Sequence, residues 1–292
     1  MPSTLAYRLV PFLLVLGSIV SLGIGTSLAK AYLFPLIGAA GTSALRTGLS
    51  AVMLLCWWRP WQTAVNRRDM TFIALYGVTL GAMNLCFYLA LKTIPFGLAV
   101  AIEFIGPLTV TVMFSRKIMD FVWILLAVSG MLMLLPLWGT QSGLDMRGVM
   151  FSLIAALCWG LYILFGKKIS HRHSGQTVAI GLVFASIVTF PMGMRDAGAI
   201  IAHPYLLPVG LLVALISSSL PMTLEMAAMK RLPHKAFGIL VSMEPAVAAI
   251  VAFLLLGESL TLIQMLAVAL SVTAGIGSAM TARPQNIRLA NE

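Results

Sequence analysis

The sequence predicts an all-α membrane protein with ten transmembrane helices, arranged as two inverted repeats of five. Three observations support this prediction. The chain of 292 residues is 60% hydrophobic and 10% charged, with a mean hydropathy of +1.00, and a soluble domain needs far more polar surface than that. Apolar runs long enough to cross a bilayer recur along the whole chain. Lysines and prolines recur in the two halves at a constant offset of 138 residues.

Ten apolar runs can be separated in order along the chain. A helix needs about 20 apolar residues to cross the hydrocarbon layer, and about 17 to 25 are tolerated. The first run has no signal-peptide cleavage site of the usual form, so we interpret it as a retained helix. The predicted spans are 9–29, 41–58, 71–91, 96–114, 121–138, 147–166, 175–194, 205–227, 236–255 and 262–281. Proline, glycine and charged residues interrupt apolar helices, and they separate these spans at Pro35 and Gly38, Arg59-Pro60, Thr93 to Pro95, Arg116-Lys117, Gly139 to Gly143, Lys167-Lys168, Pro204, Pro233 and Glu258.

Positively charged residues are distributed unequally between the two sides of the membrane. The side that takes both termini and the even-numbered loops holds 14 of the 19 lysines and arginines, and the other side holds 4. The remaining one, Arg46, lies inside the second predicted span, near its outer end. Cytoplasmic loops are enriched in lysine and arginine, so both termini are predicted to be cytoplasmic. This loop bias accounts for the net charge of +10, and we expect no nucleic-acid partner.

The two halves of the chain share several landmarks at one offset. The matched pairs are Lys30 with Lys168, Lys92 with Lys230, Pro95 with Pro233, and Pro107 with Pro245. The offset divides the chain into units 1–138 and 139–292, each with five predicted spans. Because five is odd, the two units cross the membrane in opposite senses. Such inverted repeats are a recurrent plan of secondary transporters.

Several segments resemble a known family. They are Ser27-Leu-Ala-Lys30, Phe34-Pro35-Leu36, Ala44-Leu-Arg46, Tyr76-Gly-Val with Gly81-Ala-Met-Asn84, Ala99-Val-Ala-Ile-Glu103-Phe-Ile-Gly-Pro107-Leu, Asp120-Phe-Val-Trp123, and Ser242-Met-Glu244-Pro245-Ala with Leu256-Gly-Glu258. Through them the chain, over nearly all of 1–285, is similar to the drug/metabolite transporter superfamily in its EamA-type form of two five-helix repeats. Within that superfamily it resembles the threonine/homoserine exporter branch. The resemblance implies an exporter in the cell inner (cytoplasmic) membrane, with threonine and homoserine as leading substrates.

Glu103 is the first candidate site residue, because a charge inside the hydrocarbon layer is costly and usually functional. It lies four residues before Pro107, whose missing amide hydrogen leaves the Glu103 carbonyl without its helical partner. The carboxylate and this carbonyl together could accept an ammonium group. The alternative is a carboxyl that is protonated, or paired with a lysine, and fastens two helices.

Two further acids, Glu244 and Glu225, also lie inside predicted spans. Glu244 is not the repeat equivalent of Glu103, since the offset places it on Gly106, so a central site would be asymmetric. Glu225 could bind substrate or form an ion pair with Lys230, five residues further on. Glu244 could bind substrate, or it could hold two helices together.

Polar and aromatic residues could complete such a site. Asn84 and Tyr88 are four residues apart and share a helix face, where they could bond a substrate carboxylate or a neighbouring helix. Trp159 and Tyr162 could wall a cavity or pack in the core. Arg46 could hold a substrate carboxylate, pair with an acid, or extend outward to the membrane surface.

The small and sulfur-containing residues of the spans have structural explanations. Gly77 and Gly81 have the spacing that permits close helix contact. Cys56, Cys86 and Cys158 show no metal-ligand spacing, and we expect them to be small buried hydrophobes.

The sequence contains no phosphate-binding Gly-x-x-x-x-Gly-Lys-Ser/Thr loop, no metal-ligand cluster and no Ser/His/Asp arrangement. We therefore expect no cofactor, no metal and no catalytic residue. The expected partners are a small-molecule substrate, the lipid bilayer and, if transport is coupled, protons.

The resulting hypothesis is an amino-acid exporter that works by alternating access. The substrate ammonium would face Glu103, with Glu225 or Glu244, and its carboxylate would meet Asn84, Tyr88 or a cation. Proton antiport and uniport both stay open. The alternative on the same fold is an exporter of other metabolites or drugs, such as aromatic amino acids, purines or cations. A membrane enzyme or a solute sensor is the alternative from another class.

Overall fold

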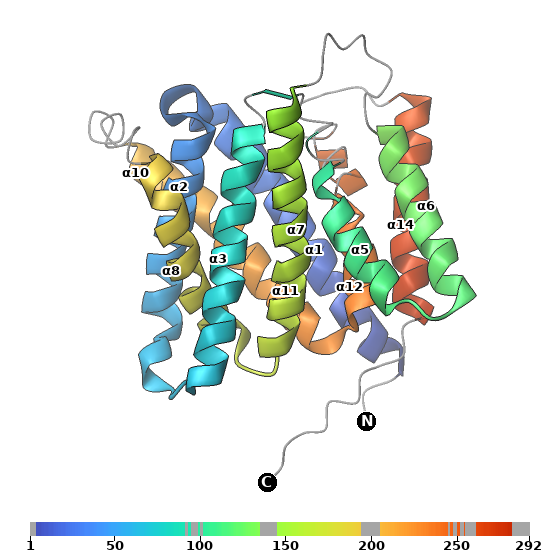
Figure 1. Ribbon diagram of the computed structural model, residues 1–292, viewed down its shortest axis with the longest axis horizontal. Helices are drawn as coiled ribbons and strands as arrows, with labels where there is room; N and C mark the ends of the chain where they lie inside the picture. Colours follow the sequence, from blue (N-terminus) through green and yellow to red (C-terminus); the bar gives the residue numbers. More distant parts are fainter. Residues whose placement is uncertain are drawn as a thin grey trace.

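The structure, a computed structural model, describes residues 4–90, 93–94, 99, 102–134, 145–193, 205–244, 246–247, 250–251, 254 and 261–281. Every element in this part of the chain is helical (Figure 1), which confirms the all-α prediction there. The α-helices are α1 (Thr4–Tyr32), α2 (Phe34–Trp58), α3 (Arg67–Ala90), α5 (Ile105–Phe114), α6 (Ile118–Leu134), α7 (Met146–Ile169), α8 (Ser174–Gly193), α10 (Leu206–Ala214), α11 (Leu220–Arg231), α12 (His234–Val241) and α14 (Leu262–Thr281). Two short elements are the 3-10 helix η1 (Pro60–Gln62) and the π-helix η3 (Leu215–Ser219).

Five helical stretches are long and apolar enough to cross a membrane, and each coincides with a predicted span. They are Leu9–Ala29, Arg67–Ala90, Met146–Ile169, Ser174–Gly193 and Leu206–Arg231. Shorter apolar helices, Ile105–Phe114, Ile118–Met133 and Met265–Ser278, coincide with the fourth, fifth and tenth spans. The repeat landmarks Lys92, Pro95 and Pro245 lie outside the described residues. Several membrane-capable helices are therefore confirmed, and the count of ten stays a prediction.

The second span begins earlier than the sequence predicts. Pro35 and Gly38 do not form a loop before it; both lie inside α2. Proline fits the first turn of a helix, where its missing amide hydrogen is not needed. Gly38 adopts φ 59° and ψ 178°, which kinks the helix at a residue that tolerates positive φ. The placement of Arg46 near the outer end of its span is therefore wrong, because Arg46 lies near the middle of α2.

Helices that are distant in the sequence pack against one another. The α3 helix packs on α7 and α8, α2 packs on α8 and α10, α1 packs on α11 and α12, and α5 packs on α7 and α12. The α6 and α14 helices form a further pair at one edge of the bundle, as Figure 1 shows. The largest fully buried side chains include Tyr76, Tyr162, Phe104 and Phe237.

Two ion pairs join the halves of the chain at one end of the bundle. Arg172, in the turn between α7 and α8, donates to Asp69 at the start of α3, with 3.0 Å between Nη1 and Oδ2. Lys235, in the first turn of α12, lies 2.7 Å from Asp120 in the first turn of α6. Both pairs connect loops that the charge distribution assigns to the cytoplasm.

The contact predicted from the spacing of Gly77 and Gly81 is present between α3 and α8. A side chain added at Gly77 would meet the backbone carbonyl of Gly181, and one added at Gly81 would meet that of Ala185. Small residues on both helices thus let their backbones approach closely.

We expect Gly77→Ala to lower the thermal unfolding midpoint of the detergent-purified protein. The added methyl group collides with backbone, which cannot rotate away, and such overpacking typically costs about 1 to 3 kcal/mol. Gly48→Ala is the matched control, because a methyl group there meets no atom within 4 Å. Alanine is favoured over glycine in a helix by about 1 kcal/mol, so the control should unfold at the same or a higher temperature. Equal midpoints for the two variants would contradict the proposed contact.

Candidate functional site

Two of the predicted spans are interrupted rather than continuous. In the fourth, residues 102–103 are helical, Phe104 forms a turn, and α5 begins at Ile105. In the ninth, α12 ends at Val241, residues 242–243 form a turn, and Glu244 is again helical. Pro107 explains the first break, because proline is tolerated in the first turn of the new helix and not in the middle of a continuous one. The fourth and ninth predicted spans therefore each contain a helix break, which their predicted bounds did not specify.

The interruptions place two acids at helix breaks. Glu103 is the last helical residue before one break, and Glu244 is the first after the other. Glu103 is 8% exposed and Glu244 is partly exposed. The two carboxylates are near enough to repel each other. The ion pairs formed by the described residues include neither acid.

A buried cation, Arg46, lies within electrostatic reach of Glu244. Arg46 is 9% exposed, and its Nη2 donates to Oδ1 of Asn84 over 2.8 Å. Asn84 in turn donates from Nδ2 to the carbonyl of Leu80 over 2.8 Å, which fixes the orientation of its amide. The Nε of Arg46 is buried and has no hydrogen-bond partner within the described ranges. Arg46 also attracts Glu244 electrostatically. The outward-extending alternative for Arg46 is therefore wrong.

An aromatic pair stands at the first break. Phe104, the turn residue itself, packs edge-on against Trp159 of α7, with ring centroids 5.1 Å apart and an interplanar angle of 76°. Trp159 is partly exposed. The thiols of Cys86 in α3 and Cys158 in α7 both lie within electrostatic reach of Glu103. These contacts bring α3 and α7 to the side of Glu103.

Tyr88 is not brought to these groups by any described contact. It is partly exposed, and its ring meets Phe87 at a centroid distance of 6.1 Å. Asn84 and Tyr88 share a helix, but only Asn84 reaches Arg46 in this conformation.

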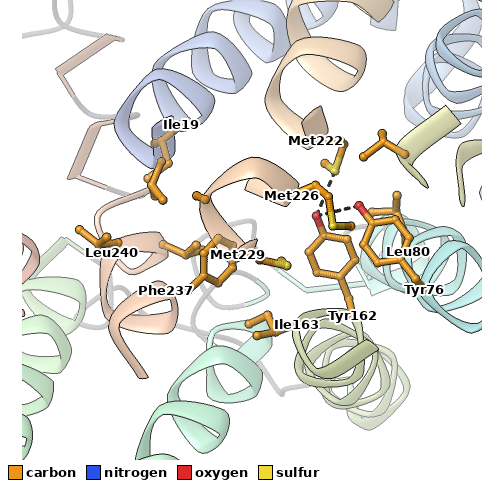
Figure 2. Packing of buried hydrophobic residues seen from close by; sticks show 14 of the residues in the cluster. Ile19, Tyr76, Leu80, Tyr162, Ile163, Met222, Met226, Met229, Phe237 and Leu240 are labelled. Carbon is orange, nitrogen blue, oxygen red and sulfur yellow. Dashed lines mark hydrogen bonds between the residues drawn. The ribbon is translucent and has the colours of Figure 1, made fainter. Parts of the chain in front are cut away.

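Glu225 belongs to a separate network. Its Oε1 accepts from Ser18 over 2.9 Å, and its Oε2 accepts from the hydroxyl of Tyr162 over 2.8 Å. The hydroxyl of Tyr76 donates to that of Tyr162 over 3.3 Å, and Figure 2 shows the two rings with Met222 beside them. The ion pairs of the described residues do not include one between Glu225 and Lys230. For Tyr162 the alternative of core packing therefore fits better than a cavity wall.

Sequence reasoning missed Ser18 and Tyr76. Ser18 is one of four hydroxyl residues in the first apolar run, and serines in such helices usually bond their own backbone, so nothing in the pattern marks it. Tyr76 stands between Gly77 and the apolar residues before it, and only its neighbours across the bundle reveal its role. The break at Phe104, in contrast, had a signal in the proline three residues later.

Comparisons with known proteins agree with this architecture. Residues 146–280 match the model of the EamA-like transporter family. The chain is 44% identical over 276 residues to the threonine/homoserine exporter RhtA of Escherichia coli (strain K12), covering 94% of this chain and 93% of the relative. It is also 44% identical over 273 residues to RhtA of Salmonella typhimurium (strain LT2), covering 94% and 92%. One solved crystal structure is 16% identical, with a TM-score of 0.67 over 95% of this chain and 97% of that one, which supports the fold alone.

These relatives and the apolar helices indicate a multi-pass inner-membrane protein. The chain belongs to the family of EamA-like transporters that includes the threonine/homoserine exporter RhtA.

Proposed function

We propose that this protein exports small amino acids, threonine and homoserine first, across the inner membrane by alternating access. The observation that carries the proposal is a buried arginine and two acids at helix breaks that lie within electrostatic reach of one another. Among the described residues, the Nε of this arginine has no hydrogen-bond partner and neither acid forms an ion pair. An amino acid at neutral pH has one carboxylate and one ammonium group, so this division of charge matches its two ends. The name of the relatives supplies the substrate candidates.

Each end of the substrate has a proposed partner. The carboxylate binds the guanidinium of Arg46, whose fork of donors suits carboxylates and whose position Asn84 fixes. The ammonium binds Glu103 and Glu244, and the Glu103 carbonyl, which lacks its helical donor because of Pro107, is a further acceptor. Discontinuous helices form the substrate sites of many secondary transporters. Trp159 is the proposed wall on the side of α7, and Tyr88 stays a candidate for the substrate hydroxyl.

We also propose the full topology of ten spans in two inverted units, 1–138 and 139–292. The helix contacts support it, because exchanging the two units maps the main contacts onto one another: α3 with α7 onto α1 with α11, α3 with α8 onto α2 with α10, and α5 with α7 onto α1 with α12. The α2–α8, α5–α12 and α6–α14 pairs map onto themselves. The break at Phe104 falls at the repeat position of the break at Ser242, 138 residues later.

We infer that both termini are cytoplasmic. In Figure 1 α1 begins and α14 ends at the same end of the bundle. Thr281, the last residue of α14, accepts from the indole of Trp123 over 3.1 Å, near the start of α6. The basic loops joined by Asp69 with Arg172, and by Lys235 with the first turn of α6, are the ones that the positive-inside rule assigns to the cytoplasm.

Other substrate classes remain the alternative on this fold. An exporter of aromatic amino acids or purines needs a wider apolar cavity than one for threonine, and an exporter of organic cations has no use for Arg46 as a carboxylate ligand. A solute sensor would bind threonine without moving it. The relatives are exporters, and we propose transport rather than catalysis.

The test is release of labelled amino acids from proteoliposomes that contain the purified protein. We expect threonine and homoserine to leave at least tenfold faster than from empty liposomes, and phenylalanine to leave little faster, since a pocket sized for one substrate discriminates by about 10- to 200-fold per small group. A second set of vesicles with an imposed pH gradient separates proton antiport, in which threonine accumulates against its gradient, from uniport. Release of phenylalanine but not threonine would support the alternative substrate class.

A further inference from the structure

Glu225 is a buried acid with a hydrogen-bond partner at each carboxyl oxygen, and it lies outside the proposed substrate site. It is 8% exposed and lies where α1, α3, α7 and α11 meet. Both carboxyl oxygens have partners, Ser18 from α1 and Tyr162 from α7, and Tyr162 is itself bonded by Tyr76 of α3. Each oxygen of Glu225 already accepts a hydrogen bond from a side chain of another helix, and the proposed transport mechanism leaves this acid without a role.

The positions of the hydroxyl groups suit a carboxyl that gains and loses a proton. Ser18 Oγ lies 2.9 Å from Glu225 Oε1 and 3.1 Å from the carbonyl oxygen of Pro221, but a hydroxyl has only one hydrogen to donate. When Glu225 is ionised, Ser18 donates to it. When Glu225 is protonated, Oε1–H donates to Ser18, and Ser18 turns to the carbonyl of Pro221. Rotation of one hydroxyl therefore satisfies both forms without moving a helix.

The other oxygen of Glu225 fits the same two states. Tyr76 donates to Tyr162, and Tyr162 donates to Oε2 of Glu225. In the protonated form the hydrogens then run in one direction, from Tyr76 through Tyr162, Glu225 and Ser18 to Pro221. In this series of hydrogen bonds each group donates its one hydrogen to the next group, so every hydrogen has an acceptor.

Among the residues that the structure describes, no cation forms an ion pair with Glu225 that would hold it permanently ionised. The titratable groups that act on it are Tyr162, Tyr76 and Glu244. Cys158 of α7 interacts with Glu103 instead. The α8 helix and η3 carry no ionisable residue. On the other packed elements the remaining ionisable residues lie toward the helix ends. They are Tyr7, Arg8, Lys30 and Tyr32 of α1, Arg67, Arg68, Asp69, Cys86 and Tyr88 of α3, Arg147, Lys167 and Lys168 of α7, Lys230 and Arg231 of α11, and His234 and Lys235 of α12.

Glu225 is linked to the substrate site through charge. Its carboxylate repels that of Glu244, which in turn repels Glu103. A negative Glu225 therefore adds to the field that attracts an ammonium group, and a neutral Glu225 weakens that field. Such coupling between two sites is reciprocal, so an ammonium bound near Glu244 favours loss of the proton from Glu225.

We propose that Glu225 is the proton-binding site of this exporter, separate from the amino-acid site, and that the two sites exchange their ligands. A proton that enters from outside binds Glu225 and loosens the amino acid at Glu103 and Glu244, so the amino acid leaves outward. Binding of the next amino acid from the cytoplasm expels the proton inward. This inference rests on the proposed amino-acid transport and selects antiport over uniport.

Calorimetric titration of the full-length purified protein with threonine tests the proposal. Repeating the titration in buffers with different ionisation enthalpies counts the protons released on binding. For the wild-type protein we expect up to one proton per threonine, and an affinity that rises about tenfold from low to high pH, within the usual range of site-to-site coupling. For Glu225→Gln we expect no proton release and the weaker, pH-independent affinity of the protonated form. Asp145→Asn, at an exposed helix cap, should behave like the wild type.

The possible outcomes separate this inference from the proposed function. If the wild type binds no threonine at any pH, the proposed function itself fails. If it binds threonine without releasing a proton, the proposed amino-acid transport stands and the proposed proton site at Glu225 is wrong. Proton release that persists in Glu225→Gln but disappears in Glu103→Gln would move the proton site to Glu103 and overturn the proposal.

A second variant guards against a folding defect in Glu225→Gln. Tyr162→Phe keeps the acid and the ring and removes one donor to the carboxylate. Donors to the charged form favour ionisation, so the pH of maximal proton release should move upward in this variant. An unchanged pH profile in Tyr162→Phe would also count against the proposal.

Discussion

Threonine affinity is expected to fall by about 100-fold when Arg46 is replaced by alanine. Removing one partner of a buried hydrogen-bonded charge pair costs about 2 to 5 kcal/mol, and each factor of ten in affinity corresponds to about 1.4 kcal/mol. The substitution removes the proposed carboxylate ligand and leaves Oδ1 of Asn84 without its donor. It also takes away the positive charge that acts on Glu244. Calorimetry on the purified protein measures the loss, and efflux from proteoliposomes should show the same rise in the threonine concentration needed for half-maximal rate.

Two further variants make this result specific. Arg147→Ala removes an equal charge from an exposed position at the start of α7 and should leave threonine affinity unchanged. Arg46→Lys keeps the charge but lacks the planar fork that binds a carboxylate through two nitrogens, so it should fall between the wild type and Arg46→Ala. Unchanged affinity in Arg46→Ala would remove Arg46 from the proposed site.

Glu103→Gln should nearly stop threonine export while leaving the fold at least as stable. A glutamine of the same shape loses the charge that holds the ammonium group, and hydrogen bonds to charged groups are worth about 1.5 to 3 kcal/mol. At about 2 kcal/mol the rate of export at low substrate concentration falls by about 30-fold. The same change removes the repulsion between Glu103 and Glu244, so the thermal unfolding midpoint should stay the same or rise.

This opposite behaviour of transport and stability distinguishes a substrate ligand from a residue that pins two helices. A pinning residue would lower the unfolding midpoint together with transport. Asp145→Asn again provides the neutral comparison, because asparagine caps a helix as well as aspartate does and Asp145 is exposed. Threonine export at the wild-type rate by correctly inserted Glu103→Gln protein would falsify the charge role of Glu103.

The helical class, the positions of most spans and the contact at Gly77 and Gly81 were predictable from the sequence. Each depends on a local signal: apolar length, loop charge, or two small residues on one face. The start of α2 was not predictable, because proline and glycine usually end helices. Here Pro35 occupies the first turn of α2, and Gly38 bends the helix. Whether a proline begins or breaks a helix depends on the residues packed around it.

The site was predictable in its residue types but not in its pairings. The isolation of Glu103 and its distance from Pro107 indicated an unusual acceptor, and the structure adds the turn at Phe104. The bond from Arg46 to Asn84 joins two helices whose relative rotation no sequence pattern specifies. For the same reason the sequence could not show that Glu225 is bonded by Tyr162, a contact between residues 63 positions apart.

The two ion pairs at the cytoplasmic end have a consequence for the speed of export. Asp69 with Arg172, and Asp120 with Lys235, each join one half of the chain to the other. Under alternating access the halves must separate at this end to admit substrate, so each turnover breaks and remakes these contacts. Dissolved salt screens the partly exposed cations of these pairs and lowers that barrier. The ionic strength of the cytoplasm would then set how often the transporter opens inward, independently of how tightly it holds its substrate.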